Sequence, residues 1–284
     1  MLIDILRLSR SIYQLLLLRK KWQYDSVGHC TSCGSLNIFV NDLDQRATLI
    51  NIIDSWNLSD KFKKKLLERE NYFCVNCLAN YRQRAHAEAV LYVLGLERSG
   101  KLVTKLKSET SFKIYETAAY NIFRNDALRN IDNYVVSEYF DGHLPGTFVN
   151  GIRNEDLEHL TFQDNSFNVL INSDVLEHVS NLDKALSEVK RVLKPGGFHV
   201  FTLPVDYELP KTTERAIVID GKIKHIMKPV LHGDTIRGSG ILAFRDFGKD
   251  VLQYMSRDGF ECKELKYFKR DQFITSVYYA QKIC

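Results

Sequence analysis

Two pairs of cysteines with the same spacing are the first residues whose types and positions indicate a chemistry. Cys30 and Cys33 enclose two residues, and so do Cys74 and Cys77. A C-x-x-C turn folds back so that both sulfurs face inward, and two such turns complete the tetrahedral coordination that Zn²⁺ prefers. Disulfides are disfavoured, because a chain with no evident export signal belongs in a reducing compartment. We predict a structural zinc, with a redox pair and unliganded thiols as alternatives.

A second group of polar residues follows an apolar run in the C-terminal half. Asp174, Glu177 and His178 have helical i, i+3, i+4 spacing, so they share one face if a helix begins near Asp174. They could then bind a divalent ion such as Mg²⁺, or His178 could remove a proton from an attacking hydroxyl. The alternative is a helix cap followed by a packed histidine. His232, from a later segment, is a further candidate catalytic residue, with a turn-forming role as its alternative.

A predicted βαβ unit positions these residues. Residues 167–171 form an apolar strand, and residues 182–193 repeat apolar side chains with the 3.6-residue period of a helix lying on a sheet. Lys194-Pro195-Gly196-Gly197 then ends the helix before a second apolar strand. Because parallel sheets bind ligands at the carboxyl ends of their strands, we expect Asp174 and His178 to face a ligand.

The segment around this unit resembles the class I S-adenosylmethionine-dependent methyltransferases, in particular the group reading D-x-x-x-L-P-F-x-D-x-S-F-D-x-V and later L-K-P-G-G. Thr161 stands where this group often has proline, and Asn168 where it usually has aspartate. The resemblance covers residues 111–284 and implies a doubly wound, mostly parallel seven-stranded α/β sheet of the Rossmann-like type. The matching positions are Asp156, Leu160, Phe162, Asp164, Ser166, Phe167, Val169 and Leu193 to Gly197.

The resemblance also implies a site for S-adenosylmethionine. Glu138 ends a strand over residues 134–138, where the family holds the two ribose hydroxyls, although a surface acid is the simpler alternative. Asp156 falls where the family meets the adenine amino group, with a turn or capping role as its alternative. The cofactor-binding residues expected from the correspondence are Glu116, Ala118, Glu138, Asp156, Leu157 and Ser173.

The loop after the first predicted strand, residues 112–115, departs from the family. Ala118 and Tyr120 stand where glycines are expected. Alanine fits at a negative φ, whereas tyrosine at a positive φ is strained. A rival hypothesis follows, in which a non-catalytic binding or scaffold protein keeps the fold and loses the cofactor, with Tyr120 or Phe123 occupying the methionine site.

Bulk properties set the wider bounds. The 284 residues are 45% hydrophobic with a net charge of +4, and the first 110 residues are basic while the rest is slightly acidic. Contact with RNA or a membrane surface is compatible with that asymmetry, and an ordinary solvated surface explains it more simply. The first 18 residues are apolar but broken by charges, so they neither span a bilayer nor form a secretory signal. We expect a cytoplasmic protein in which this segment packs on the domain or a partner, with peripheral membrane contact through residues 1–21 as the alternative.

These observations predict four segments: an amphipathic helix over residues 1–28, a zinc-ribbon-like module over 29–85, a linker helix over 86–110 and a methyltransferase domain over 111–284. The expected function is S-adenosylmethionine-dependent methyl transfer. A small molecule, sugar or lipid-linked acceptor is favoured, because the basic charge is thin for a nucleic-acid footprint. An RNA methyltransferase is the alternative, since zinc modules precede some of those enzymes.

Overall fold

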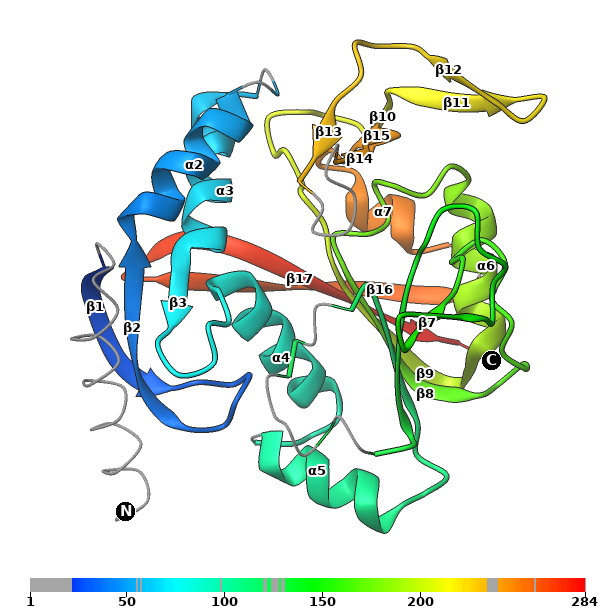
Figure 1. Cartoon of the computed structure of the whole chain (residues 1–284), viewed down its shortest axis with the longest axis horizontal. Coiled ribbons are helices and arrows are strands. Elements are labelled where there is room, and N and C mark those ends of the chain that lie inside the picture. The colour runs from blue at the N-terminus through cyan, green and yellow to red at the C-terminus, as the bar shows by residue number, and fades with distance from the viewer. Residues whose placement is uncertain are drawn as a thin grey trace. The chain divides into compact units, whose positions relative to one another are not determined.

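The computed structural model describes residues 22–54, 56, 58–97, 99–119, 122–123, 128, 131–233, 240–257 and 259–283 (Figure 1). The chain divides into two compact units. We call them the N-terminal unit (Met1–Ser108, Asn121–Ile131 and Lys266–Ser276) and the sheet unit (Glu109–Tyr120, Asp132–Leu265 and Val277–Cys284).

The units and the predicted segments divide the chain differently. The segment expected as one methyltransferase domain contributes Asn121–Ile131 and Lys266–Ser276 to the N-terminal unit. Of the predicted helix over residues 1–28, residues 1–21 lie outside the described part, and Trp22–His29 form a strand. The four segment boundaries stay predictions. No helix in the described ranges is long and apolar enough to cross a membrane.

Capping residues set where the main helices of the N-terminal unit begin. The Ser59 side chain accepts a hydrogen bond from the Phe62 N–H at the start of α3. Asn80 and Gln83 form a capping box at the start of α4. The described residues of this unit form a three-stranded antiparallel sheet, β1-β2-β3, and helices between and after its strands: β1 (Trp22–His29), β2 (Leu36–Asp42), α2 (Leu43–Asp54), α3 (Asp60–Asn71), β3 (Tyr72–Cys74), α4 (Tyr81–Val93) and α5 (Ser99–Ser108).

An eight-stranded sheet in the order β16-β17-β9-β8-β4-β5-β7-β6 organises the sheet unit (Figure 1). Neighbours from β9 to β7 pair in parallel, and β17 pairs antiparallel with β9. The predicted mostly parallel fold is confirmed, and β6 adds a short antiparallel strand to the expected seven. The strands are β4 (Ile114–Thr117), β5 (Tyr134–Glu138), β6 (Phe148–Val149), β7 (Ile152–Asn154), β8 (Phe167–Ser173), β9 (Leu193–Thr202), β16 (Phe260–Lys269) and β17 (Gln272–Lys282).

Helix α6 (Leu182–Val192) joins β8 to β9, as the hydrophobic period predicts. The Asn181 side chain caps it by accepting the Lys184 N–H. Its apolar face is buried in the sheet unit's core, where each large side chain contributes roughly 1.5–3 kcal/mol. The buried residues of this face are Leu182, Ala185, Leu186, Val189 and Val192.

An insertion lies between β9 and β16. It consists of three short strand pairs, β10 with β15, β11 with β12 and β13 with β14, and one short helix. Their bounds are β10 (Thr213–Glu214), β11 (Ala216–Ile219), β12 (Lys222–His225), β13 (Leu231–His232), β14 (Ile241–Leu242), β15 (Arg245–Asp246) and α7 (Val251–Met255).

Candidate functional site

The four predicted zinc ligands lie together in the N-terminal unit. The sulfur atoms of Cys30, Cys33, Cys74 and Cys77 are all within 4.8 Å of one another. The Cys30 and Cys77 sulfurs are 3.7 Å apart, and four sulfurs about 2.3 Å from one Zn²⁺ would be about 3.8 Å apart. Hydrogen bonding to Cys30 lowers the pKa of Cys33, and hydrogen bonding to Cys33 raises that of Cys30. Donor set and spacing both fit a tetrahedral zinc.

Both cysteine turns share one backbone conformation. The Gly34 N–H donates to the Cys30 carbonyl at 2.7 Å, and the Leu78 N–H donates to the Cys74 carbonyl at 2.8 Å. Gly34 has a φ of +73° and Leu78 a φ of +59°. Glycine adopts this left-handed conformation without strain and leucine does not. The second turn is therefore strained at Leu78.

A cavity of about 660 Å³ opens in the sheet unit at the carboxyl ends of the central strands. Parallel sheets bind ligands at this edge, and the volume is typical of a small-molecule site. Residues of the strand ends and following loops line it, including Tyr115, Thr117, Ala118, Ala119, Ser137, Glu138, Asp156, Leu157 and Glu158. Residues of the turn after β8 and of the insertion also line it, and most of these are apolar: Asp174, Val175, His178, Val179, Ser180, Val218, Ile223, Ile241, Leu242 and Phe244.

The loop after β4 lies against the carboxylate that ends β5. The Ala119 N–H donates to Glu138 Oε2 at 3.1 Å, and the Tyr139 N–H donates to Glu138 Oε1 at 2.8 Å. Ala118 has a φ of +60°, whereas the sequence suggests that alanine fits here at a negative φ. The loop thus keeps a backbone conformation suited to glycine although its residue is alanine.

Two other predicted cofactor residues lie on the central strands β4 and β8. The described residues that line it do not include Glu116 or Ser173. Both are buried, and the Tyr134 hydroxyl donates to Glu116 Oε2 at 2.6 Å. Burial and the adjacent Glu116 carboxylate raise the pKa of Tyr134 well above its usual value. The predicted cofactor contacts of Glu116 and Ser173 stay predictions.

Asp156 and Leu157 line the cavity, where the resemblance places the adenine. Asp156 Oδ1 also accepts the Glu158 N–H at 2.8 Å, and Oδ2 lies 3.3 Å from His159 Nδ1. The two interpretations of Asp156 are therefore compatible, because its carboxylate caps a turn at the cavity wall.

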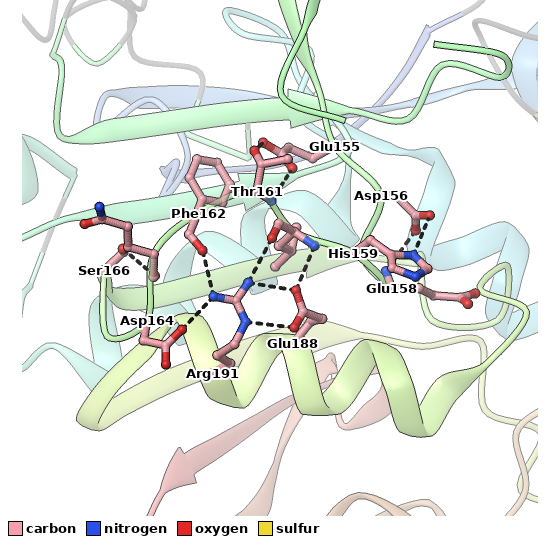
Figure 2. Close-up of polar contacts among 12 residues, drawn as sticks. Glu155, Asp156, Glu158, His159, Thr161, Phe162, Asp164, Ser166, Glu188 and Arg191 are labelled. Carbon is pink, nitrogen blue, oxygen red and sulfur yellow. Dashed lines mark hydrogen bonds and ion pairs between the residues drawn. The ribbon is translucent and has the colours of Figure 1, made fainter. Parts of the chain in front are cut away.

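Arg191 of α6 binds the loop that carries Asp156. Its guanidinium donates to the Leu160 and Phe162 carbonyls at 2.8 and 2.7 Å and to Asp164 at 2.8 Å. It also forms two hydrogen bonds with Glu188, both 2.8 Å (Figure 2). This contact with Arg191 is the main reason that the pKa of Glu188 is lowered. The D-x-x-x-L-x-F-x-D pattern thus holds the loop on α6.

One departure from the family pattern has a structural cause. The Thr161 N–H and hydroxyl both donate to Glu155, at 3.0 and 2.6 Å. Glu155 is 3% exposed and also accepts from Arg153 at 2.7 Å. Proline has no N–H and no hydroxyl. Threonine at this position gives the buried carboxylate two donors, and proline would leave it with Arg153 alone.

The predicted helix start at Asp174 is wrong. Asp174 has a φ of +51°, and residues 176–178 form a turn instead. Its carboxylate accepts the Thr202 hydroxyl at 2.7 Å, and its N–H donates to the same side chain at 3.1 Å. This bond to the end of β9 and the left-handed backbone turn the chain, and α6 begins only at Leu182. Asp174 therefore does not join Glu177 and His178 on a helix face, and the expected Mg²⁺ ligand set does not form.

Instead, the structure brings His232 to Glu177 and His178. One ligand atom of each lies within 4.8 Å of the other two. His178 Nε2 is 3.8 Å from Glu177 Oε1, and His232 Nδ1 is 4.0 Å from the same oxygen. The two imidazole rings meet edge to face with centroids 4.9 Å apart. Glu177 is 1% exposed.

Sequence reasoning missed the apolar wall of the cavity and the partnership of His232 with Glu177. Val218, Ile223 and Leu242 belong to short strand pairs. The hydrophobic pattern of strands this short does not distinguish a strand that lines a cavity from one in an exposed hairpin. His232 was singled out, but its separation from Glu177 along the chain gave no signal of proximity. Of the residues expected to block the methionine site, Tyr120 lies outside the described part, and Phe123 is buried without lining the cavity.

Known proteins similar to this chain are methyltransferases. Residues 75–201 match the family described as "Methyltransferase domain". A probable phthiotriol/phenolphthiotriol dimycocerosates methyltransferase 2 of Mycobacterium ulcerans is 43% identical over 60 residues, 21% of this chain and 22% of that protein. The ubiquinone/menaquinone biosynthesis C-methyltransferase UbiE of Hydrogenovibrio crunogenus is 55% identical over 40 residues, 14% and 16% respectively. The chain thus matches less than a quarter of either relative's length. The structure of an S-adenosylmethionine-dependent methyltransferase from Mesorhizobium loti is 15% identical, with a TM-score of 0.36 over 63% of this chain and 96% of that one.

The sheet order and the cavity at its carboxyl edge define a Rossmann-like α/β protein of the methyltransferase type. The match to the methyltransferase-domain family extends over residues 75–201, less than half of the 284-residue chain. That match begins beside Cys74 in the N-terminal unit and ends within β9.

Proposed function

We propose that the sheet unit binds S-adenosylmethionine in its cavity and transfers the methyl group to an acceptor that enters beside the insertion. The observation that carries this proposal is one cavity lined both by Glu138 and Asp156 and by apolar side chains of the insertion. The carboxylates suit the nucleoside of the cofactor, and the apolar side chains suit an acceptor.

The residues present fit the cofactor. Glu138 is a carboxylate at the end of a central strand, able to accept hydrogen bonds from two adjacent hydroxyls at once. The left-handed φ of Ala118 keeps the loop after β4 in a conformation that brings the backbone of Ala119 against Glu138. Leu157 offers an apolar surface for the adenine ring beside Asp156.

Methyl transfer mainly requires that the acceptor atom, the methyl group and the cofactor's sulfur be aligned. S-adenosylmethionine supplies a methyl group already activated by its positively charged sulfur, so no strong general base is needed. Glu138 and Asp156 orient the nucleoside, and Leu242 and Phe244 offer the acceptor an apolar surface. Binding and orienting both the cofactor and the acceptor in this way supports catalysis without a general acid–base pair.

The favoured acceptor is an apolar small molecule or a lipid-linked one. The side chains of Val218, Ile223, Ile241, Leu242 and Phe244 support this choice. The two curated relatives are named for phthiotriol dimycocerosates and for ubiquinone and menaquinone, which are lipid-like acceptors. A sugar would demand more hydrogen-bonding groups than this wall offers.

We further propose that the four cysteines hold a structural zinc, with Gly34 and Leu78 shaping the two turns. Elemental analysis of purified protein should find one tightly held zinc per chain, and Cys74→Ser should release it and lower the melting temperature. Zinc-free protein with unchanged stability would contradict this role.

Calorimetry with S-adenosylhomocysteine tests the cofactor site. We expect one site per chain and a dissociation constant raised about 10- to 150-fold by Glu138→Gln, the loss of charged hydrogen bonds worth about 1.5–3 kcal/mol. Glu261→Gln is the matched control, because Glu261 is exposed and forms a surface ion pair with Lys263. No binding heat with folded, zinc-loaded protein would refute the proposal.

With a labelled methyl donor and a cell extract, the label should enter the organic phase; label in RNA instead would contradict the acceptor class.

A further inference from the structure

The hairpin of β11 and β12 presents apolar side chains on the surface of the sheet unit. It extends from that unit at the upper right of Figure 1. Ile219, Ile223 and Ile226 are each about half exposed, at 46, 51 and 56%, and Met227 beside them is also exposed. Exposed apolar patches of this kind mark surfaces that contact a partner or a membrane.

The cross-strand register gives the hairpin two different faces. Val218 pairs with Ile223, and both line the cavity. Residues directly opposite each other share a face, and the next residue along each strand points to the other face. The face directed away from the cavity, which we call the outward face, therefore carries the two flanking pairs, Ile217 with Lys224 and Ile219 with Lys222. Each isoleucine of the outward face thus lies beside a lysine.

Local contacts hold the hairpin in this shape. Asp220 and Gly221 form its two-residue turn with φ of +50° and +71°, and positive φ at both positions is the signature of the turn that matches the twist of paired strands. At the base, the carbonyl of buried Arg215 accepts the N–H groups of Ile226 and Met227, at 2.8 and 3.0 Å. The outward face is therefore preformed.

The charge of this segment indicates what the outward face contacts. Residues 216–228 contain three lysines, Lys222, Lys224 and Lys228, and one acid, Asp220. Lysine stems lie along apolar surface while their ammonium groups reach polar surroundings. Isoleucines beside lysines therefore match the interface of an anionic bilayer, where acyl chains lie beneath negatively charged headgroups.

Two other occupants fit the outward face less well. In a two-fold contact between copies of the chain the same surface meets itself, so lysines of one copy would face lysines of the other. Surfaces that bind single-stranded RNA combine basic side chains with aromatic rings on which bases stack, and residues 216–228 contain no phenylalanine, tyrosine or tryptophan. A lipid surface matches both the lysines and the isoleucines.

We propose that the outward face of the β11–β12 hairpin docks the sheet unit on an anionic lipid bilayer. Val218 and Ile223 on the opposite face line the cavity, so docking brings the cavity wall close to the bilayer. One extension rests on the proposed function: the acceptor is a membrane lipid whose apolar chain passes along Val218 and Ile223 into the cavity.

Cosedimentation of zinc-loaded full-length protein with vesicles tests the docking surface. One set of vesicles contains phosphatidylglycerol and phosphatidylcholine in equal parts, and the other contains phosphatidylcholine alone. We expect tighter binding to the anionic set, weakened by added salt. Lys222→Gln combined with Lys224→Gln should lower the partition coefficient on anionic vesicles about 30-fold, about fivefold for each lysine. Ile219→Ser should lower it about three- to tenfold, because the exposed half of the isoleucine side chain no longer enters the bilayer.

Matched controls lie in the sheet unit outside the insertion. Lys113→Gln combined with Lys263→Gln is the control for charge, because both lysines are exposed. Leu144→Ser is the control for Ile219→Ser, because Leu144 is 76% exposed. Absence of binding to anionic vesicles would overturn the inference. Binding that the hairpin variants lower no more than the controls do, as contact through residues 1–21 would give, would overturn it as well.

Further measurements on the same samples separate the alternatives. Self-association that Ile219→Ser abolishes, with vesicle binding unchanged, would identify a second copy as the occupant and overturn the inference. Retention of RNA without vesicle binding would overturn it too. Binding of S-adenosylhomocysteine without vesicle binding defeats the docking surface alone, and vesicle binding without cofactor binding defeats the proposed function alone.

Discussion

Replacing Ala118 with glycine should stabilise the sheet unit, although a glycine normally destabilises a folded protein. Ala118 has a φ of +60°, and a left-handed conformation costs an L-residue about 1–2 kcal/mol. Glycine removes that cost but gives the unfolded chain more conformational freedom, worth about 0.4–1 kcal/mol. The expected net gain in the free energy of unfolding is about 0.5–1 kcal/mol.

Ala119 is the matched control for this change. It is the next residue of the same loop and is not among the residues with positive φ, so Ala119→Gly should lose about 0.4–1 kcal/mol. Urea unfolding followed by hydrogen exchange of β4 and β5 amides would report the sheet unit separately from the N-terminal unit. Ala118→Val should be less stable than wild type, because a β-branched residue is more strained at positive φ. If Ala118→Gly were destabilised as much as Ala119→Gly, the left-handed conformation of the loop would be refuted.

Three further changes test other parts of the structure. Leu78→Gly should raise the melting temperature of the zinc-loaded protein by removing about 0.5–1 kcal/mol of net strain in the second cysteine turn; a lower melting temperature would contradict that. Arg191→Ala should cost about 2–3 kcal/mol in urea unfolding because charged hydrogen bonds to the acidic loop are lost, and Arg191→Lys less; an unchanged midpoint would show that the loop does not depend on them. Because the pKa of Glu188 is lowered in the folded protein, its ionised carboxylate adds to the free energy of unfolding above the unfolded pKa of about 4.3. That contribution is lost as pH falls through the folded pKa, so the free energy of unfolding should fall less steeply at acid pH in Arg191→Ala. Thr161→Pro, although it restores the family residue, should cost about 2–4 kcal/mol by removing two donors from buried Glu155, and a neutral effect in thermal unfolding would contradict this account.

The fold was predictable where the signal is local. Helix α6 and strands β8 and β9 follow from apolar periodicity and from the Lys194–Gly197 turn, because each of these patterns is complete within a dozen residues. The cysteine pairs were predictable for the same reason, since a C-x-x-C turn places its two sulfurs by local geometry alone. The motif from Asp156 to Asp164 was found as well, but not its contacts with Arg191.

The errors arose where distant segments decide the local backbone. Asp174 has the sequence of a helix cap, yet its bond to Thr202 of β9 gives it a left-handed φ and postpones the helix. Ala118 likewise takes a conformation that composition does not suggest. In both places the neighbouring strand imposes a backbone angle that the residue's own preference opposes.

The sequence by itself determined the parallel βαβ order, the two cysteine turns, the resemblance to methyltransferases and the residues from which a cofactor site can be built. Only the tertiary structure decided which of those residues meet. It brought His232 to Glu177 and His178 without Asp174, and it placed apolar residues of the insertion in the same cavity as Glu138. The physical reason is that periodicity and turn chemistry act over a few residues, whereas a binding site consists of contacts between segments that only packing of the whole sheet unit brings together.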